Sequence, residues 1–146
     1  MVMIEQRYGD IELDEALHHS LEQLMARYCI SESAERIVLN CRQKSYYLHR
    51  QGLHPIEVQF KRESPSSDWQ VVCFASFSYP NESSIAVEPE LYFHLVNRWC
   101  YQPDSGAADL SHPEVLELLM VWMKAFARHL SRNVFDEMQL TMVREF

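Results

Sequence analysis

Two neighbouring stretches, Asn40-Cys41-Arg42-Gln43-Lys44-Ser45-Tyr46-Tyr47 and Gly52-Leu53-His54-Pro55-Ile56-Glu57-Val58-Gln59-Phe60, decide how this chain folds. In the second stretch apolar and polar residues alternate from Ile56 to Phe60, which is the period of a strand that buries one face. A glycine and a His-Pro pair stand directly before this run. We therefore expect a strand that begins near Ile56 and whose first residues are held in a fixed position.

Hydrophobic periodicity divides the rest of the chain into helices and strands. Apolar residues at helical spacing predict a helix over 14–30, capped by Asp14 or Asp10, that leaves His18 and Glu22 mostly to solvent. The capping-box pattern from Ser111 to Glu114 predicts a second helix that runs to about 131. Strands are expected over 36–41, 69–79, 91–101 and 138–142, and residues 44–53 are expected to form a loop.

The order of these elements, α-β-β-β-β-α-β, predicts a single α+β domain over residues 1–146. Consecutive strands joined by short turns should be antiparallel, so we expect a curved, mainly antiparallel sheet of about five strands. The N-terminal and C-terminal helices should pack on one face of it. The aromatic residues of 69–79 and 91–101 are expected to form core against a helix.

The net charge of −8 is unevenly distributed. Residues 34–62 carry six basic and two acidic side chains, whereas both flanking segments are acidic. An acidic total argues against general affinity for nucleic acid or for an anionic membrane. The mixture of cations and tyrosines over 42–50 is of the kind that holds single-stranded nucleic acid, but the net charge argues against nucleic acid as a partner. No apolar run reaches the roughly 18 residues of a membrane span, and residues 1–14 do not resemble a signal peptide, so we expect a cytoplasmic protein.

Several kinds of chemistry are excluded by spacing. The three glycines, Gly9, Gly52 and Gly106, lie too far apart for a P-loop, a dinucleotide fingerprint or a nucleophile elbow. The four cysteines form no Cys-x-x-Cys pair and are expected to be buried free thiols. The seven histidines show no ligand spacing, so we predict neither a metal nor a cofactor.

His54 is the histidine most suited to a functional role, because the neighbouring glycine and proline hold it in place. Oriented by Glu57 or Glu90 it has the properties of a general base, although fixing the turn is the simpler interpretation. We first expect a non-catalytic binding or adaptor protein for a protein partner or a small anionic ligand. The alternatives are a small acid-base enzyme, for which no recognisable catalytic motif exists, and an acidic inhibitor that mimics DNA. The candidate binding residues are Asn40, Arg42, Ser45, Tyr46, His54, Glu57 and Glu90.

An ordered series of short motifs also suggests a family. It comprises Asn40 to Tyr46, Gly52 to Val58, Trp69-Gln70, Phe77-Ser78-Tyr79, Pro89-Glu90-Leu91 and Asp136-Glu137. With these motifs the chain resembles the DUF2787-like family of small gammaproteobacterial proteins, which is catalogued only as a domain of unknown function. The resemblance implies one domain and no particular activity. Two positions depart from the family pattern, because Gln43 and His94 stand where an acidic residue is usual, which puts a family function in doubt.

Overall fold

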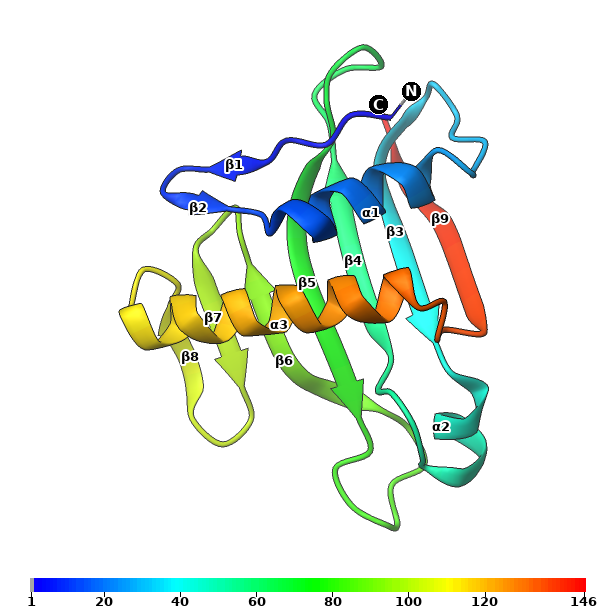
Figure 1. Cartoon of the computed structure of the whole chain (residues 1–146), viewed down its shortest axis with the longest axis vertical. Coiled ribbons are helices and arrows are strands. Elements are labelled where there is room, and N and C mark those ends of the chain that lie inside the picture. The colour runs from blue at the N-terminus through cyan, green and yellow to red at the C-terminus, as the bar shows by residue number, and fades with distance from the viewer. Residues whose placement is uncertain (1) are drawn as a thin grey trace.

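The computed structural model describes residues 2–146, which form one α+β domain (Figure 1). Three helices and nine strands follow one another in an order that begins with a small hairpin and ends with a strand. The elements are β1 (Arg7–Tyr8), β2 (Ile11–Glu12), α1 (Glu15–Met25), β3 (Ala34–Arg42), α2 (Lys44–His49), β4 (Ile56–Lys61), β5 (Gln70–Ser78), β6 (Glu88–His94), β7 (Trp99–Gln102), β8 (Gly106–Asp109), α3 (Pro113–Ser131) and β9 (Glu137–Glu145).

A seven-stranded sheet is the centre of the fold, with the order β8-β7-β6-β5-β4-β3-β9. Every pairing of neighbouring strands in it is antiparallel. Helices α1 and α3 lie side by side across one face of this sheet (Figure 1). The predicted class, the antiparallel pairing and the two helices on one face are confirmed, but the prediction of about five strands is wrong.

The register of the strands decides which side chains meet the helices. One row of directly paired residues crosses five strands and is buried under α1 and α3, and it consists of Leu39, Val58, Phe74, Phe93 and Cys100. Since side chains alternate along a strand, the next row points to the opposite side. That row consists of Asn40, Glu57, Ala75, Tyr92 and Tyr101. We call the side turned away from the helices the outer face.

The strand predicted over 91–101 is in fact a hairpin. β6 ends at His94, and the chain turns through 95–98 with Arg98 in the left-handed region at φ 62° and its N–H donating to His94 O over 2.8 Å. The strand β8 then pairs with β7 and adds a further edge. Because the turn reverses the chain, the expected aromatic core is only partly formed. Phe93 is fully buried, whereas Tyr101 is 36% exposed on the outer face.

The helix ends differ from the predictions by a few residues. Asp14 caps α1 by accepting from Leu17 N, but the helix ends at Met25 and not near Ile30, because its last turn tightens into short bonds such as Tyr28 N to Met25 O. The cap of α3 is His112 rather than Ser111, and His112 Nδ1 accepts from Glu114 N. Among the cysteines, Cys41, Cys73 and Cys100 are buried free thiols, but Cys29 is exposed.

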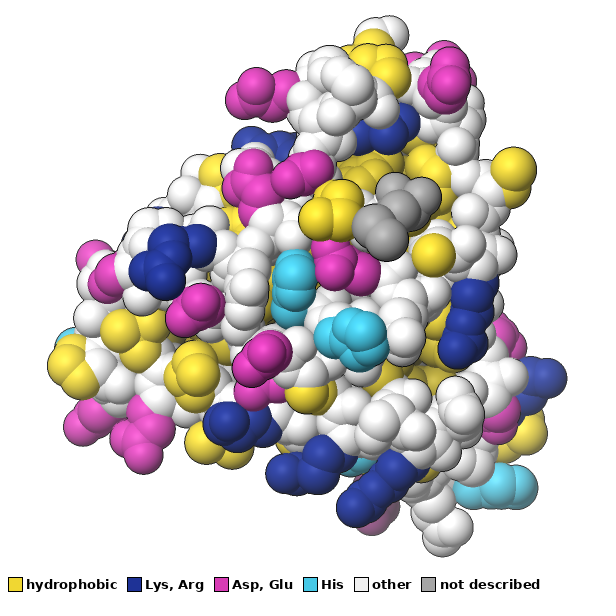
Figure 2. All heavy atoms as spheres, turned by 45° about the horizontal axis from the view of Figure 1, so that its top comes forward, with side chains coloured by type: hydrophobic (Ala, Val, Ile, Leu, Met, Phe, Trp, Pro, Cys, Tyr) yellow, Lys and Arg dark blue, Asp and Glu magenta, His cyan; other side chains and the backbone are white. Residues whose placement is uncertain are grey.

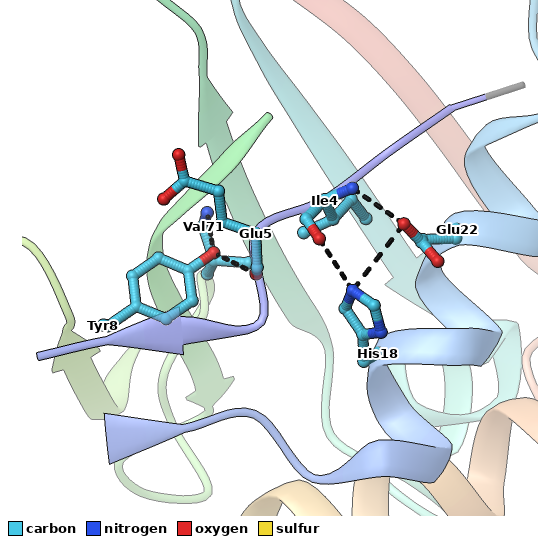
Figure 3. Close-up of polar contacts among 6 residues, drawn as sticks. All are labelled: Ile4, Glu5, Tyr8, His18, Glu22 and Val71. Carbon is cyan, nitrogen blue, oxygen red and sulfur yellow. Dashed lines mark hydrogen bonds and ion pairs between the residues drawn. The ribbon is translucent and has the colours of Figure 1, made fainter. Parts of the chain in front are cut away.

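Residues 2–13, which we call the N-terminal segment, cross the helix-covered side and are tied down by side chains (Figure 3). Ile4 N donates to Glu22 Oε2 over 2.8 Å, and His18 Nε2 lies 2.7 Å from Ile4 O. The Tyr8 hydroxyl donates to a carbonyl of its own segment and accepts from Val71 N at the start of β5. Burial raises the pKa of this phenol far above its usual range. His18 and Glu22 therefore hold the backbone of the segment, contrary to the prediction that they face solvent.

Residues 44–53, predicted to be a loop, contain the helix α2. Gln43 joins this helix to both of its neighbours, since its Nε2 donates to Val134 O over 2.7 Å and its Oε1 accepts from Leu53 N over 2.6 Å. Gly52 has a φ of 102°, and a side chain there would collide with the Gln43 amide. The backbone before β4 is thus fixed, as the Gly-Leu-His-Pro run predicts. A carboxylate in place of Gln43 would lose the bond to Val134 O, because it has no N–H to donate.

Candidate functional site

A cleft of about 330 Å³ opens where the ends of β4, β5 and β6 meet the second half of α3. Its apolar lining comes from both the sheet and the helix and consists of Leu53, Ile56, Leu91, Trp122, Ala125 and Phe126. Five polar side chains complete the wall, and they are His54, Ser76, Glu90, Gln102 and His129. An apolar hollow with a few convergent polar groups is the usual form of a small-molecule site.

His54 and Glu90 form a hydrogen-bonded pair in this wall. His54 Nδ1 lies 2.9 Å from both carboxylate oxygens of Glu90, and Ser76 Oγ donates to Glu90 Oε2 over 3.1 Å. A carboxylate only accepts, so the proton of a neutral His54 ring stands on Nδ1. Both hydrogen bonds that His54 makes within residues 2–146 use Nδ1, which leaves the Nε2 lone pair for a bound molecule.

Tyr46 supports the imidazole from the side of α2. Its ring centroid lies 4.6 Å from that of His54, and its side chain is only 5% exposed. The Tyr46 ring also stacks on Tyr79 at 5.5 Å, and the Tyr46 hydroxyl accepts from Tyr79 N over 3.1 Å. The ring that packs on His54 is therefore itself fixed at both its face and its hydroxyl. Together Glu90 and Tyr46 hold the imidazole in one orientation.

Ser76 and His129 belong to the cleft but are absent from the residues that sequence patterns suggest. Ser76 is buried, and a serine inside the apolar run of β5 is a signal that points to it. His129 comes from α3, far away in sequence. Burial, together with Arg128 and Arg132, lowers the pKa of His129, so that its ring is neutral at pH 7.

The other predicted binding residues do not share this cleft. Asn40 and Glu57 are paired with each other on the outer face, so Glu57 cannot orient His54. Arg42 Nη1 lies 3.4 Å from Glu137 Oε1, beside a separate hollow under α2. Ser45 Oγ donates to Gln51 O over 2.9 Å and closes the turn after α2. The predicted set therefore divides into His54 and Glu90 in the cleft wall, Tyr46 packed against His54 outside the wall, and the remaining residues elsewhere.

Charge is dispersed over the face that Figure 2 draws. Acidic and basic side chains are intermingled there, with histidines near the middle, and the acidic side chains form no continuous ridge on this face.

Within the described residues no three His, Cys, Asp or Glu side chains gather as a metal site. None of the helices in residues 2–146 is long and apolar enough to cross a membrane.

These features define an α+β domain with a helix-covered antiparallel sheet and a small apolar cleft at one end of it. The chain belongs to the DUF2787 family, described as proteins of unknown function, whose sequence profile matches residues 15–141. The resemblance noted in the sequence is thereby confirmed. No significant match is found among curated proteins.

Two solved structures from Vibrio cholerae share the fold. The hypothetical protein VC0508 from the VSP-II pathogenicity island superposes with a TM-score of 0.82 at 22% identity, covering 98% of this chain and 100% of that one. The conserved hypothetical protein VC1805 from pathogenicity island VPI-2 gives 0.77 at 20% identity, covering 95% and 100%. VC1805 is described as sharing structural homology with the human P32 protein. At such identities the likeness concerns the fold alone.

Proposed function

We propose that this protein is a non-catalytic binding protein that takes a small, mostly apolar ligand into the cleft and hydrogen-bonds it through His54. The observation that carries the proposal is the attachment of His54 to Glu90 through Nδ1, at 2.9 Å, in the wall of an apolar hollow. An oriented acceptor in apolar surroundings selects for a ligand with one donor group, because an unmatched polar group costs free energy to bury.

The charge of the cleft favours a neutral ligand over an anionic one. Glu90 is the acidic residue in the wall, and no Lys or Arg is among the residues that line it. An anion placed beside His54 would share the cleft with the Glu90 carboxylate, and this repulsion is unfavourable in partly buried surroundings. A hydroxyl or amide donor meets no such repulsion. The proposal therefore replaces the anionic ligand expected from the basic segment with a neutral one.

The test uses two probes that differ only in their polar end, 3-phenylpropan-1-ol and 3-phenylpropanoate, titrated into the ¹⁵N-labelled protein and followed by amide and indole shifts. The alcohol should bind the wild type, and the carboxylate should bind about tenfold more weakly. His54→Phe keeps a ring but removes the acceptor, so the alcohol should bind about 2- to 12-fold more weakly. His49→Phe, at the exposed end of α2, is the matched control and should bind as the wild type does.

Ala125→Trp provides the complementary test, because it fills the cleft from α3 without removing a polar group. It should abolish binding of the alcohol, whereas Met120→Trp at a 39% exposed position of the same helix should not. Unchanged binding in Ala125→Trp would show that the cleft is not the site. Tighter binding of the carboxylate than of the alcohol would overturn the choice of a neutral ligand.

A small acid-base enzyme is the second candidate, and it is favoured by the same imidazole, since a histidine oriented by a carboxylate is a competent general base. Ser76 donates to Glu90 and not to His54, so His54 activates no serine nucleophile here and its chemistry would be proton transfer to a bound ligand or water. Turnover of a bound neutral ligand by wild type, lost in His54→Phe but retained in His49→Phe, would favour the enzyme over the binding protein.

A further inference from the structure

The outer face of the sheet carries a second group of aromatic side chains, on β6 and β7. The register places His94 opposite Trp99, and Tyr92 lies two residues before His94 on the same face. The ring planes are nearly parallel, with 14° between His94 and Trp99 and 16° between Tyr92 and Trp99. All three side chains are partly exposed. Parallel, accessible rings on a sheet face provide a surface on which a planar ring can stack.

His94 adds a hydrogen-bond donor to this surface. Its Nδ1 accepts from Asn97 N over 3.0 Å in the turn that follows β6, so a neutral ring keeps its proton on Nε2. Burial, Arg36 and Lys61 each lower the pKa of His94, which keeps the ring neutral at pH 7. The Nε2–H is therefore a fixed donor beside the Trp99 ring.

Two cations lie on the same side of the sheet. Arg36 on β3 and Lys61 on β4 are direct partners in the register, and, besides burial, the positive charge of each lowers the pKa of His94. Neither forms an ion pair with another side chain of residues 2–146. Glu57 also points to the outer face. Besides burial, its charge raises the pKa of Tyr92, but it is not among the groups that shift the pKa of His94. Asp109, the direct partner of Trp99 in the register, is a second acidic residue on this face. Neither Glu57 nor Asp109 forms an ion pair with Arg36 or Lys61, and these two cations are the charged groups that shift the pKa of His94.

We propose that this surface binds a planar aromatic ring that carries one anionic group, of the size of a nucleoside monophosphate. The ring stacks against Trp99 and Tyr92, and the anion meets Arg36, Lys61 and the His94 Nε2–H. A free nucleotide is favoured over a nucleic acid strand because the net charge of −8 repels a polyanion. The site is independent of the cleft, since Ile56, Ser76 and Leu91 in the cleft wall point to the opposite side of the sheet.

Calorimetric titration with AMP, adenosine and inorganic phosphate at low salt tests this inference. AMP should bind saturably, and adenosine and phosphate should each bind at least tenfold more weakly, because each supplies half of the contacts. Trp99→Leu and the double variant Arg36→Gln/Lys61→Gln should each weaken AMP binding by about tenfold or more. The double variant changes only partly exposed side chains, so the test stands if Trp99→Leu fails to fold. Lys124→Gln on α3 and His54→Phe are the controls and should bind AMP as wild type does.

Absence of saturable AMP binding would overturn the inference, as would binding that both site variants leave unchanged. Phosphate that binds as tightly as AMP would overturn the stacking contact. A single-stranded oligonucleotide that binds more tightly than AMP would overturn the choice of a free nucleotide. Because His54→Phe affects only the cleft, loss of one site and loss of the other are distinguishable.

Discussion

Two histidine–carboxylate pairs occur within residues 2–146, and they are used in opposite ways. His18 and Glu22 both bind the backbone of Ile4, with His18 Nε2 at 2.7 Å from the carbonyl and Glu22 accepting from the amide (Figure 3). Their side chains are 18% and 20% exposed. His54 and Glu90 bind each other through Nδ1, with side chains 42% and 36% exposed beside a cleft.

The difference shows what separates a structural pair from a candidate site. In the first pair the side chains bind the N–H and the C=O of Ile4, which would otherwise lack these hydrogen-bond partners. In the second pair the carboxylate fixes the imidazole and leaves Nε2 free for a ligand, as in sites where an acid orients a histidine. The comparison predicts a loss of stability from mutations at the first pair and a loss of binding from mutations at the second.

Glu22→Ala should give the largest effect on stability. It leaves the partly buried Ile4 N without an acceptor, which costs about 1–3 kcal/mol of unfolding free energy. Urea unfolding measures this cost, and His54→Phe is the comparison, with an expected change of less than about 1 kcal/mol because His54 is partly exposed. Equal losses in the two variants would contradict the division between the pairs.

Ser76→Ala should mainly affect ligand binding. It removes one of the two side chains that hold the Glu90 carboxylate, so the imidazole is less well oriented. We expect 3-phenylpropan-1-ol to bind about 2- to 10-fold more weakly, with a stability change near 1 kcal/mol. Ser78→Ala, two residues further along β5, is the matched control. A Ser76→Ala protein that binds the probe as wild type does would remove Ser76 from the site.

Substitution of His129 should have the smallest effect on stability, because no carboxylate is among the groups that shift its pKa and the ring makes no ion pair within residues 2–146. Burial, Arg128 and Arg132 lower its pKa in the folded protein, so the unfolded chain binds the proton more tightly. The stability that the neutral ring contributes is therefore complete above the unfolded-state pKa of about 6.5 and is lost below it, as the pH falls through the lowered pKa of the folded state. Urea unfolding at pH 7.5 and 5.5 should show wild type losing slightly more stability than His129→Gln. The opposite sign would contradict the lowered pKa.

Local sequence patterns predicted the class of the fold better than they predicted the number of its helices and strands. The alternation from Ile56 to Phe60 correctly gave β4, and the apolar arc of 113–131 correctly gave α3. The hairpin β6–β7 was missed because its strands and turn are both apolar and aromatic, and only Asn97 signals a turn. The helix α2 was missed because its stability comes from the packing of Tyr46 and from Gln43, which are tertiary contacts.

The candidate site was only partly predictable for a similar reason. Gly52 and Pro55 indicate that His54 is held in place, but nothing in the local sequence shows which acid it meets. Glu57 is nearer along the chain, yet its position three residues later in β4 sends it to the outer face, while the pairing of β5 with β6 brings Glu90 to His54. His129 comes from α3, and its place in the cleft depends on how the helix lies across the sheet.

The protonation of His54 tests the central claim most directly. A long-range ¹H–¹⁵N spectrum of the imidazole rings, recorded at a pH where they are neutral, assigns the proton to Nδ1 or Nε2. We predict that His54 carries it on Nδ1, because Glu90 accepts there, whereas His18 and His94 carry it on Nε2. We also predict that 3-phenylpropan-1-ol shifts the His54 Nε2 signal. A neutral His54 protonated on Nε2, or an Nε2 signal that ignores the probe, would contradict the assignment of this cleft as the binding site.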